Sequence, residues 1–473
     1  MDVDAVVVGS GPNGLAAALT LAKAGQRVVV LEAADTPGGG ARTVTDPHVD
    51  GLVHDHCSAV HPLAVASPGF QQFNLERYGL AFAYAPIQLA HPFDDGSAAV
   101  LTHDLHDTAA RLGSDGKTWE ALFGPLVANH EALTAQVLGP LLRWPNDPLL
   151  VARFGVHAAL PATTLARRFA HDHTRALFLG LAAHGMTNLA WPFTAAIGLT
   201  LGLAAHTVGW PVIAGGSQQL TRALVAALED HGGEVVTGVT VKAMSDLPSH
   251  KVALFATSPT ALAEIVGDAL PARDRRRFAS WRYGPSAYKV DFAVNGAVPW
   301  TNLSAREAAT LHLGGGADEI HAGERAVVAG QMVTRPFTLV SQPHVADPSR
   351  GVNGVTPLWA YTHVPHNDPV DAATYVREQI ERFAPGFTRQ ILNETVTTPA
   401  GFAAGNANYV GGDIAVGLTS PRQLLARPKL HPDPYKTGAP GVWLCSAATP
   451  PGPGVHGMCG VHAARSALTV LNS

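Results

Sequence analysis

The stretch Asp4–Glu32, DAVVVGSGPNGLAAALTLAKAGQRVVVLE, decides the fold. The apolar runs 4–8 and 26–31 are rich in valine and predict two buried parallel strands. Between them, the Ala/Leu-rich segment 15–23 predicts a helix that ends at Gly25. The order strand, glycine turn, helix, strand and acid is typical of a dinucleotide-binding fold.

The glycine turn and the final acid of this stretch carry the nucleotide chemistry. Gly9 permits the tight turn, Gly11 lets the backbone approach a pyrophosphate, and Gly14 allows the helix to pack closely on the strand. The start of the helix offers free N–H groups and a positive dipole end to phosphate. Glu32 can accept hydrogen bonds from ribose hydroxyls and would repel a 2′-phosphate, which argues against NADP.

The loop that follows, Thr36–Thr43 (TPGGGART), bears on the choice between FAD and NAD. Its glycines, Gly39 among them, let the chain fold back over the nucleotide, and Arg42 is spaced to reach the phosphates. This loop resembles the extension after the acidic residue in the amine oxidase and phytoene desaturase class of flavoproteins. The resemblance favours FAD.

Two later blocks are expected to rejoin the first sheet. The first has a helix over 218–231 and strands that we place at 234–236, 239–241 and 251–256. The second has a strand over 441–446, a Gly/Pro-rich loop, and a helix over 459–471. The positive end of that last helix can stabilise negative charge developing on a reduced flavin.

The intervening segments are expected to enclose the substrate. Residues 77–208 are Ala/Leu-rich and predict mostly helix. The mixed segment 281–422 predicts a helix and several strands, which we place at 372–383 and at 287–294, 326–331 and 357–363. We therefore predict an α/β fold with a Rossmann-type FAD-binding domain assembled from discontinuous segments, 1–76, 209–280 and 423–473. The segments 77–208 and 281–422 would form a mixed-sheet and helical substrate-binding domain.

Taken together, the blocks resemble the phytoene desaturase (carotenoid desaturase) family of FAD-dependent oxidoreductases, in particular its bacterial phytoene dehydrogenase-like branch. The matching stretches are Gly9–Thr43, Gly209–Gln218, Tyr283–Trp300, Gly411–Ile414 and Asp433–Ala467. The resemblance implies that FAD is bound by Gly9, Gly11, Gly14, Glu32, Gly39, Arg42, Val239, Gly457 and Met458.

Two departures from the family pattern leave the substrate open. Ser446 stands where family members often have glycine after the last strand, and Pro453 stands where glycine is common in the final loop. Neither change prevents FAD binding.

The catalytic residue stays unknown at this level, because flavin desaturation needs little beyond orientation, exclusion of water and sometimes a base. His456 has the best positional argument, since its loop is expected to face the flavin, and His56 and His61 follow the Arg42 loop. Four further residues could have either a functional or a purely structural role. His184 could face the substrate channel or be a buried, hydrogen-bonded histidine, and Asp413 could bind substrate or stabilise a turn. Cys57 and Cys445 could attach flavin covalently or be ordinary thiols.

The resemblance implies a desaturase or dehydrogenase that transfers hydride from a lipophilic alkene, polyene or isoprenoid-like substrate to flavin N5. One alternative is a flavin amine oxidase, for which Tyr409 and Trp443 are the available aromatic residues; another is an FAD-dependent double-bond isomerase. A non-enzyme alternative is an escort-type protein that binds prenylated partners. The electron acceptor is left open among oxygen, a quinone and another carrier, and so is the oligomeric state.

Bulk composition narrows the remaining classes. The net charge is −5 without a long run of one sign, so we expect neither nucleic-acid binding nor a basic surface for anionic lipid. Three scattered cysteines form no zinc spacing, and the histidines lack a ligand pattern, so we expect no metal. The chain shows neither a signal peptide nor a spanning segment, which predicts a cytoplasmic protein and leaves peripheral membrane contact open.

Overall fold

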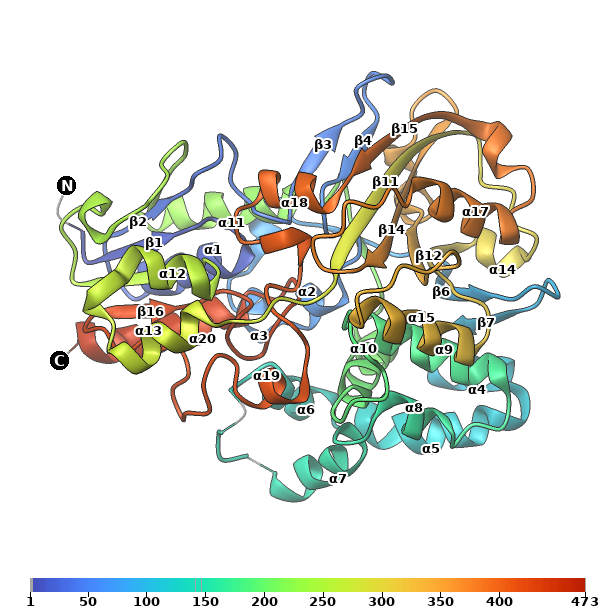
Figure 1. Cartoon of the computed structure of the whole chain (residues 1–473), viewed down its shortest axis with the longest axis horizontal. Helices are drawn as coiled ribbons and strands as arrows, with labels where there is room; N and C mark the ends of the chain where they lie inside the picture. The colour runs from blue at the N-terminus through green and yellow to red at the C-terminus, as the bar shows by residue number, and fades with distance from the viewer. Residues whose placement is uncertain (1–2, 141, 146, 473) are drawn as a thin grey trace.

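The computed structural model describes residues 3–140, 142–145 and 147–472, with both ends of the chain on the same side of the molecule (Figure 1). Its first sheet is parallel, has five strands and the order β16-β10-β1-β2-β9. These strands are β1 (Ala5–Val8), β2 (Val28–Leu31), β9 (Glu234–Val236), β10 (Val252–Phe255) and β16 (Val442–Leu444). Three separate parts of the chain therefore build one sheet, and the α/β fold class is confirmed.

Apolar side chains of these strands point alternately to the two faces of the sheet, so both faces must be shielded from water, and helices cover each of them. On one face lie α1 (Pro12–Lys23), α11 (Gln218–Asp230) and α20 (Met458–Leu471), packed on Val7, Val30 and Leu254. On the other lie α12 (Pro259–Val266) and α13 (Ala272–Ala279), packed on Val6, Val29 and Phe255.

Close contacts between backbones position the start of α1. A Cβ atom on Gly14 would lie 1.9 Å from the carbonyl oxygen of Gly9, so only glycine fits between helix and turn. A Cβ atom on Gly460 would lie 1.8 Å from the carbonyl oxygen of Asn13, so α20 also packs directly on α1. The two helix N-termini are thereby held beside the turn after β1.

The second sheet has seven strands in the order β15-β11-β14-β13-β12-β6-β7 and is antiparallel except where β12 pairs with β6. The strands are β6 (Ile87–Pro92), β7 (Ala98–Leu101), β11 (Ser286–Asn295), β12 (Ala308–Leu313), β13 (Thr338–Ser341), β14 (Val355–Val364) and β15 (Ile391–Thr397). Its helices are α14 (Leu303–Arg306), α15 (Ala317–Val328), α16 (Pro343–Ala346), α17 (Ala373–Phe383) and α18 (Pro399–Gly405).

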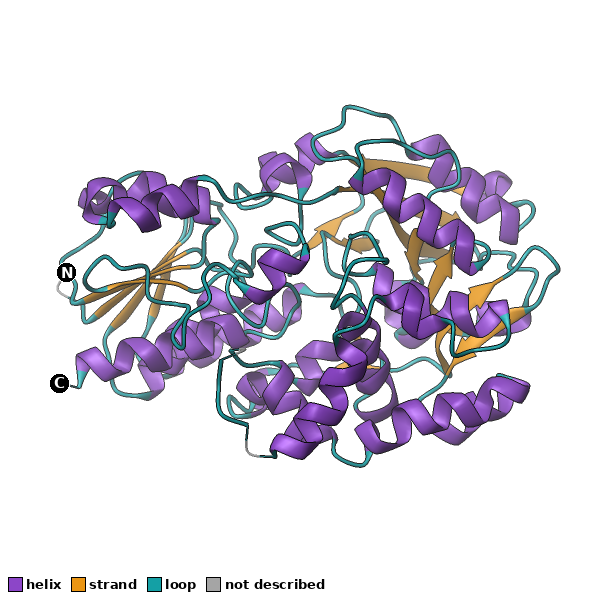
Figure 2. Ribbon diagram, turned by 60° about the horizontal axis from the view of Figure 1, so that its bottom comes forward, coloured by secondary structure: helices purple, strands orange, loops and turns teal. Residues whose placement is uncertain are grey.

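A helical layer lies beside the second sheet, and Figure 2 shows both sheets and this layer from a second side. It contains α4 (Leu105–Arg111), α5 (Gly116–Val127), α6 (His130–Val137), α7 (Pro148–Ala158), α8 (Ala162–Ala166), α9 (Asp172–Ala183) and α10 (Ala195–Thr207). The connecting elements are α2 (Pro62–Ala66), α3 (Pro68–Gln71), α19 (Pro421–Leu425) and the pairs β3 (Thr43–Thr45) with β4 (Val53–Asp55) and β5 (Phe82–Ala83) with β8 (Val212–Ile213). No helix among the described residues is long and apolar enough to cross a bilayer.

Two expectations about elements are wrong. Residues 239–241 are not a strand: β9 is the edge of its sheet, the chain turns at Gly238, and the Val239 N–H bonds to the Glu32 carbonyl at 2.8 Å. Residues 326–328 are the last turn of α15, whose helical spacing buries Ile320, Glu324 and Val327 on one side, and 329–331 are a turn and loop. The segment 77–208 holds α4 to α10 and is mostly helical, as expected. It also holds β5, β6 and β7, which the sequence did not indicate because short strands paired with distant partners carry little local signal.

Candidate functional site

A cavity of about 1030 Å³ extends from the carboxyl ends of the parallel strands into the space between the second sheet and the helical layer. Most of the predicted nucleotide residues line it: Gly9, Gly11, Gly14, Glu32, Gly39, Arg42 and Val239. The histidines His61 and His456 line it too, whereas His56, Gly457 and Met458 are not among its lining residues. The fold thus brings together residues that are more than 400 positions apart in sequence.

The turn between β1 and α1 presents bare backbone to this cavity. Gly11 precedes α1 with φ −63° and ψ 169°, and a Cβ atom added to it would meet no protein atom within 4 Å. Gly9 has φ +96°, a conformation that favours glycine, and lies against Ala256. Since the first N–H groups of a helix lack intrahelical partners, the open space beside Gly11 suits an anionic group.

The carboxylate of Glu32 is held in place at the end of β2. Its Oε2 accepts hydrogen bonds from the Ser10 N–H at 2.8 Å and the Ser10 hydroxyl at 2.5 Å, and its Oε1 accepts one from the Ala34 N–H at 2.9 Å. A carboxylate has about four acceptor positions, so a ribose hydroxyl can still donate to it. Glu32 thus lines the same cavity as the glycines of the turn after β1.

Arg42 ties two loops together at the cavity wall. Its Nε donates to the Gly39 carbonyl at 2.8 Å, and one terminal nitrogen donates to the Gly405 carbonyl at 2.9 Å. The guanidinium has five donors, so these two bonds leave capacity for a phosphate. The Arg42 loop therefore closes against the end of α18.

His456 is locked into the loop that precedes α20. It is 1% exposed, its Nδ1 accepts a hydrogen bond from the Met458 N–H at 3.0 Å, and its Nε2 donates to the Gly452 carbonyl at 3.2 Å. Burial lowers the pKa of His456 to about 4, so the ring is neutral near pH 7. With both nitrogens bonded to backbone, this histidine shapes the loop instead of offering a free base.

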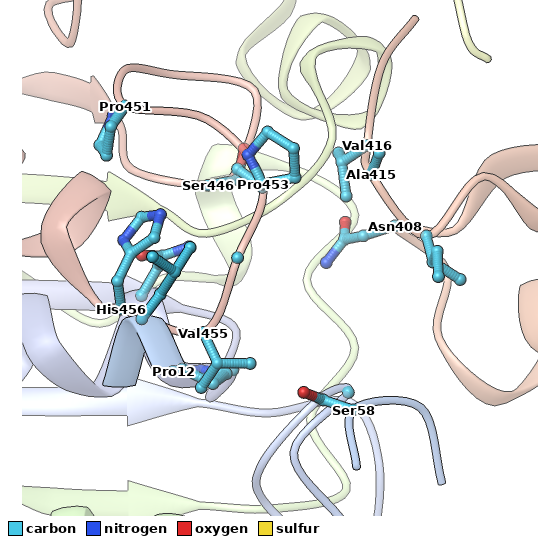
Figure 3. Close-up of a pocket in the computed structure, with 18 of the residues that line it drawn as sticks. Pro12, Ser58, Asn408, Ala415, Val416, Ser446, Pro451, Pro453, Val455 and His456 are labelled. Atoms are coloured by element: carbon cyan, nitrogen blue, oxygen red, sulfur yellow. The ribbon is translucent and has the colours of Figure 1, made fainter. Parts of the chain in front are cut away.

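Figure 3 shows how this loop bounds the cavity. Pro453 and Val455 lie on one side together with Ser446, and Asn408 and Val416 lie on the other.

His61 and His56 differ in position. The Nε2 atom of His61 lies 2.8 Å from the Ser217 hydroxyl, which donates to the Ser58 carbonyl, so Nε2 carries the proton, and Nδ1 has no hydrogen-bond partner among the described residues. Burial lowers the pKa of His61 to about 4. His56 lies beside Phe402, and burial, then the charges of Arg42 and Lys289, lower its pKa to about 4.

Two of the remaining candidates have structural roles. Asp413 accepts bonds at 2.8 Å from the N–H groups of Gly284, Ala415 and Gly417, so it locks a turn, and burial raises its pKa. Trp443 packs on the far side of the first sheet, where its Nε1 donates to Ser466.

The two cysteines also differ in position. Cys57 lines the cavity beside Tyr409, whereas Cys445 is buried outside the cavity lining, and burial raises the pKa of both thiols. Within the described parts of the chain, no cluster of three or more His, Cys, Asp or Glu side chains is arranged to hold a metal ion.

Sequence reasoning missed the polar residues of the second sheet and Arg427. Trp359 and Tyr361 line the cavity, and the alternation of the predicted strand 357–363 could have placed them on one face. Arg427 donates to the carbonyls of Ala447 and Ala415 and leaves Nη1 without a partner among the described residues. Burial lowers the pKa of Arg427 to about 10, so the side chain stays cationic at neutral pH. No local sequence motif predicts that this residue lies at the cavity.

Comparison with known proteins agrees with this geometry. Residues 7–73 match the family described as NAD(P)-binding Rossmann-like domain. A hydroxyneurosporene desaturase from Cereibacter sphaeroides is 27% identical over 99% of this chain and 98% of its own. Pyridine nucleotide-disulfide oxidoreductase domain-containing protein 2 from Rattus norvegicus is 23% identical over 98% of this chain and 93% of its own.

Solved structures share the fold at low sequence identity. An oxidoreductase from Methanosarcina mazei has a TM-score of 0.65 and 13% identity, covering 98% of this chain and 100% of its own. Putrescine oxidase bound to putrescine has a TM-score of 0.62 and 17% identity, with 100% of both chains covered. The predicted resemblance to the phytoene desaturase-like family is confirmed, and the chain is a flavin-dependent oxidoreductase.

Proposed function

We propose that this chain binds FAD along the first sheet and dehydrogenates a lipophilic alkene, polyene or isoprenoid-like substrate in the chamber beyond it. In this proposal the segments 1–76, 209–280 and 423–473 form the FAD-binding domain, and 77–208 and 281–422 form the substrate-binding domain. When bound, FAD supplies N5 as the hydride acceptor. The chain itself orients the two reactants and excludes water.

The observation that carries the proposal is the open cradle at Gly11. Its Cβ position faces free space at the start of α1, between the held carboxylate of Glu32 and the Arg42 loop. Backbone N–H groups, a ribose acceptor and a guanidinium thus meet in one cavity, which is the donor and acceptor set that a dinucleotide requires. Met458 and Gly457 are proposed to act through the N-terminus of α20, which packs on α1.

The chamber favours an apolar substrate over an amine. Its helical wall includes Phe154, Ile197 and Leu201, and Glu32, at the nucleotide end, is the single acid among the described lining residues. Of the two aromatic residues named for an amine oxidase, Tyr409 lines the cavity but Trp443 does not, so these two cannot form an aromatic cage there. The amine oxidase alternative therefore has support only from shared fold.

The rim of the chamber is apolar and suits a lipid bilayer, the source of a lipophilic substrate. Leu142, Leu425 and Leu430 line the cavity and are also exposed to solvent. Nearby, Trp144 is 87% exposed, and α7, at the lower edge of Figure 1, turns Leu149 outward.

Two arginines beside this rim favour its contact with an anionic lipid surface. Arg143 and Arg153 lie exposed next to it, although the chain as a whole carries −5. The sequence alone gave no reason to expect a basic surface for anionic lipid, and the exposed Asp147 offsets part of this charge. The two arginines beside the apolar rim nevertheless support peripheral contact with anionic lipid.

The test is an absorbance spectrum of the purified chain, followed by anaerobic mixing with isoprenoid alkenes. Flavin bands that bleach on mixing would support a dehydrogenase, and oxidised flavin with a changed product would favour the isomerase alternative. A chain that neither contains flavin nor takes up added FAD would refute the proposal and favour the escort-type alternative.

A further inference from the structure

A row of polar side chains crosses three neighbouring strands of the second sheet and faces the chamber. Thr310 of β12 pairs with Ser341 of β13, and Ser341 pairs with Trp359 of β14. Residues directly opposite one another in adjacent strands point to the same face of a sheet. All three residues line the cavity, so the row forms part of the substrate chamber wall.

Two polar atoms of this row have no protein partner. Ser341 is 1% exposed and Trp359 is 7% exposed, yet neither Ser341 Oγ nor Trp359 Nε1 has a hydrogen-bond partner among the described residues. The third member, Thr310, accepts a hydrogen bond from Trp210 at 3.1 Å. Other buried polar atoms among the described residues also lack a partner, but these two donors lie opposite each other in the cavity wall, where one ligand group could accept from both and replace the bonds to water lost on folding.

The neighbouring groups are neutral. His184 lines the cavity and its Nε2 lies 2.9 Å from Nε2 of His312; burial lowers the pKa of His184 to about 3 and that of His312 well below its usual value. Burial also raises the pKa of the Tyr361 phenol, so this side chain keeps its proton. A wall of neutral donors suits a neutral oxygen, whereas a carboxylate or an ammonium would lack a counter-charge there.

We propose that the chamber binds a lipophilic substrate that carries a neutral oxygen, a hydroxyl or a carbonyl, and that this oxygen accepts hydrogen bonds from Ser341 and Trp359. The inference rests on the proposed function, since it names the class of substrate for the same chamber. It distinguishes an oxygenated substrate from a pure hydrocarbon. A hydrocarbon has no acceptor, so both donors would stay unpaired when it binds, which is unfavourable.

The test compares two radiolabelled probes, a C20 isoprenoid alcohol and the hydrocarbon with the same carbon skeleton. Each probe is partitioned between detergent micelles and the chain purified with added FAD, in wild-type, Ser341→Ala, Trp359→Phe and doubly substituted forms. We expect each substitution to weaken alcohol binding about tenfold, as for one lost hydrogen bond, and to change hydrocarbon binding less than about twofold. Each probe is compared only with itself across the variants, so its affinity for the micelle is the same in every measurement and cancels.

Thr338→Val is the matched control, because Thr338 is buried on the same strand, donates to the Pro336 carbonyl and does not line the cavity. It should leave both probes unaffected. Equal losses for alcohol and hydrocarbon, undiminished alcohol binding in the double variant, or no binding of either probe would overturn the inference.

Flavin content and flavin reduction, measured on the same preparations, separate the two proposals. The alcohol-specific loss in a chain that binds no flavin would leave the oxygen site standing and refute the proposed function. Flavin bleaching by an alkene without the alcohol-specific loss would support the proposed function and refute the oxygen site.

Discussion

Replacing Gly11 by alanine should separate nucleotide binding from folding. The residue has φ −63° and ψ 169°, which alanine adopts without strain, and its Cβ atom would meet no protein atom within 4 Å. The folded chain without cofactor should therefore be as stable as wild type, or more stable by about 0.4–1 kcal/mol because alanine restricts the unfolded chain.

The same methyl group would enter the space that a pyrophosphate needs beside α1. Hydrogen bonds from backbone N–H to a charged phosphate contribute about 1.5–3 kcal/mol each, so displacing the phosphate from one of them should cost about that much. Since about 1.4 kcal/mol corresponds to a tenfold change, we expect the Kd for FAD to rise about 10- to 100-fold.

The assay is titration of FAD into the cofactor-free chain, followed by quenching of flavin fluorescence, with thermal unfolding of the same cofactor-free samples. Gly124→Ala in α5 is the control, because its added Cβ atom would also find room, with Leu105 at 4.0 Å, and it lies outside the cavity lining. An unchanged Kd for Gly11→Ala, or an equal rise for Gly124→Ala, would refute the reasoning.

Three further predictions test other parts of the structure. Gly460→Ala should lower the free energy of unfolding by about 3 kcal/mol in urea titrations, since its Cβ atom would lie 1.8 Å from the Asn13 carbonyl; a wild-type midpoint would contradict the α1–α20 packing. The pKa of His61 is lowered to about 4, so between about pH 6.5 and pH 4 this side chain is protonated in the unfolded chain but neutral in the folded chain. The free energy of unfolding should therefore fall as pH drops below about 6.5. His61→Gln should reduce that loss by about 1 kcal/mol per pH unit between pH 6 and pH 5, and unchanged pH dependence would be the opposing result. Trp144→Ser with Leu149→Ser should reduce sedimentation with anionic vesicles at least about tenfold and leave flavin content unchanged; Val470→Ser, exposed on α20, is the control, and binding equal to wild type would exclude this rim as the contact.

Local sequence was sufficient for the nucleotide half of the molecule. The turn at Gly9, the helix from Pro12 and the strand that ends before Glu32 are adjacent in sequence, and backbone geometry dictates their arrangement. The strand pattern also identified β11 and β14, two of the seven strands of the second sheet, whereas a Val/Ala-rich helix end at Ala326 was misread as a strand because short apolar runs suit both states.

The chemistry of the chamber was decided by tertiary structure. The roles of His456 and Asp413 depend on backbone N–H and carbonyl groups that only the folded loops bring within reach. The row Thr310, Ser341 and Trp359 depends on the register of three strands, and registers between distant segments leave no local mark in sequence. Sequence determined the strand, glycine turn and helix of the proposed nucleotide site because they are built from consecutive residues, whereas the wall of the proposed substrate chamber is built from residues that meet only when the sheet forms.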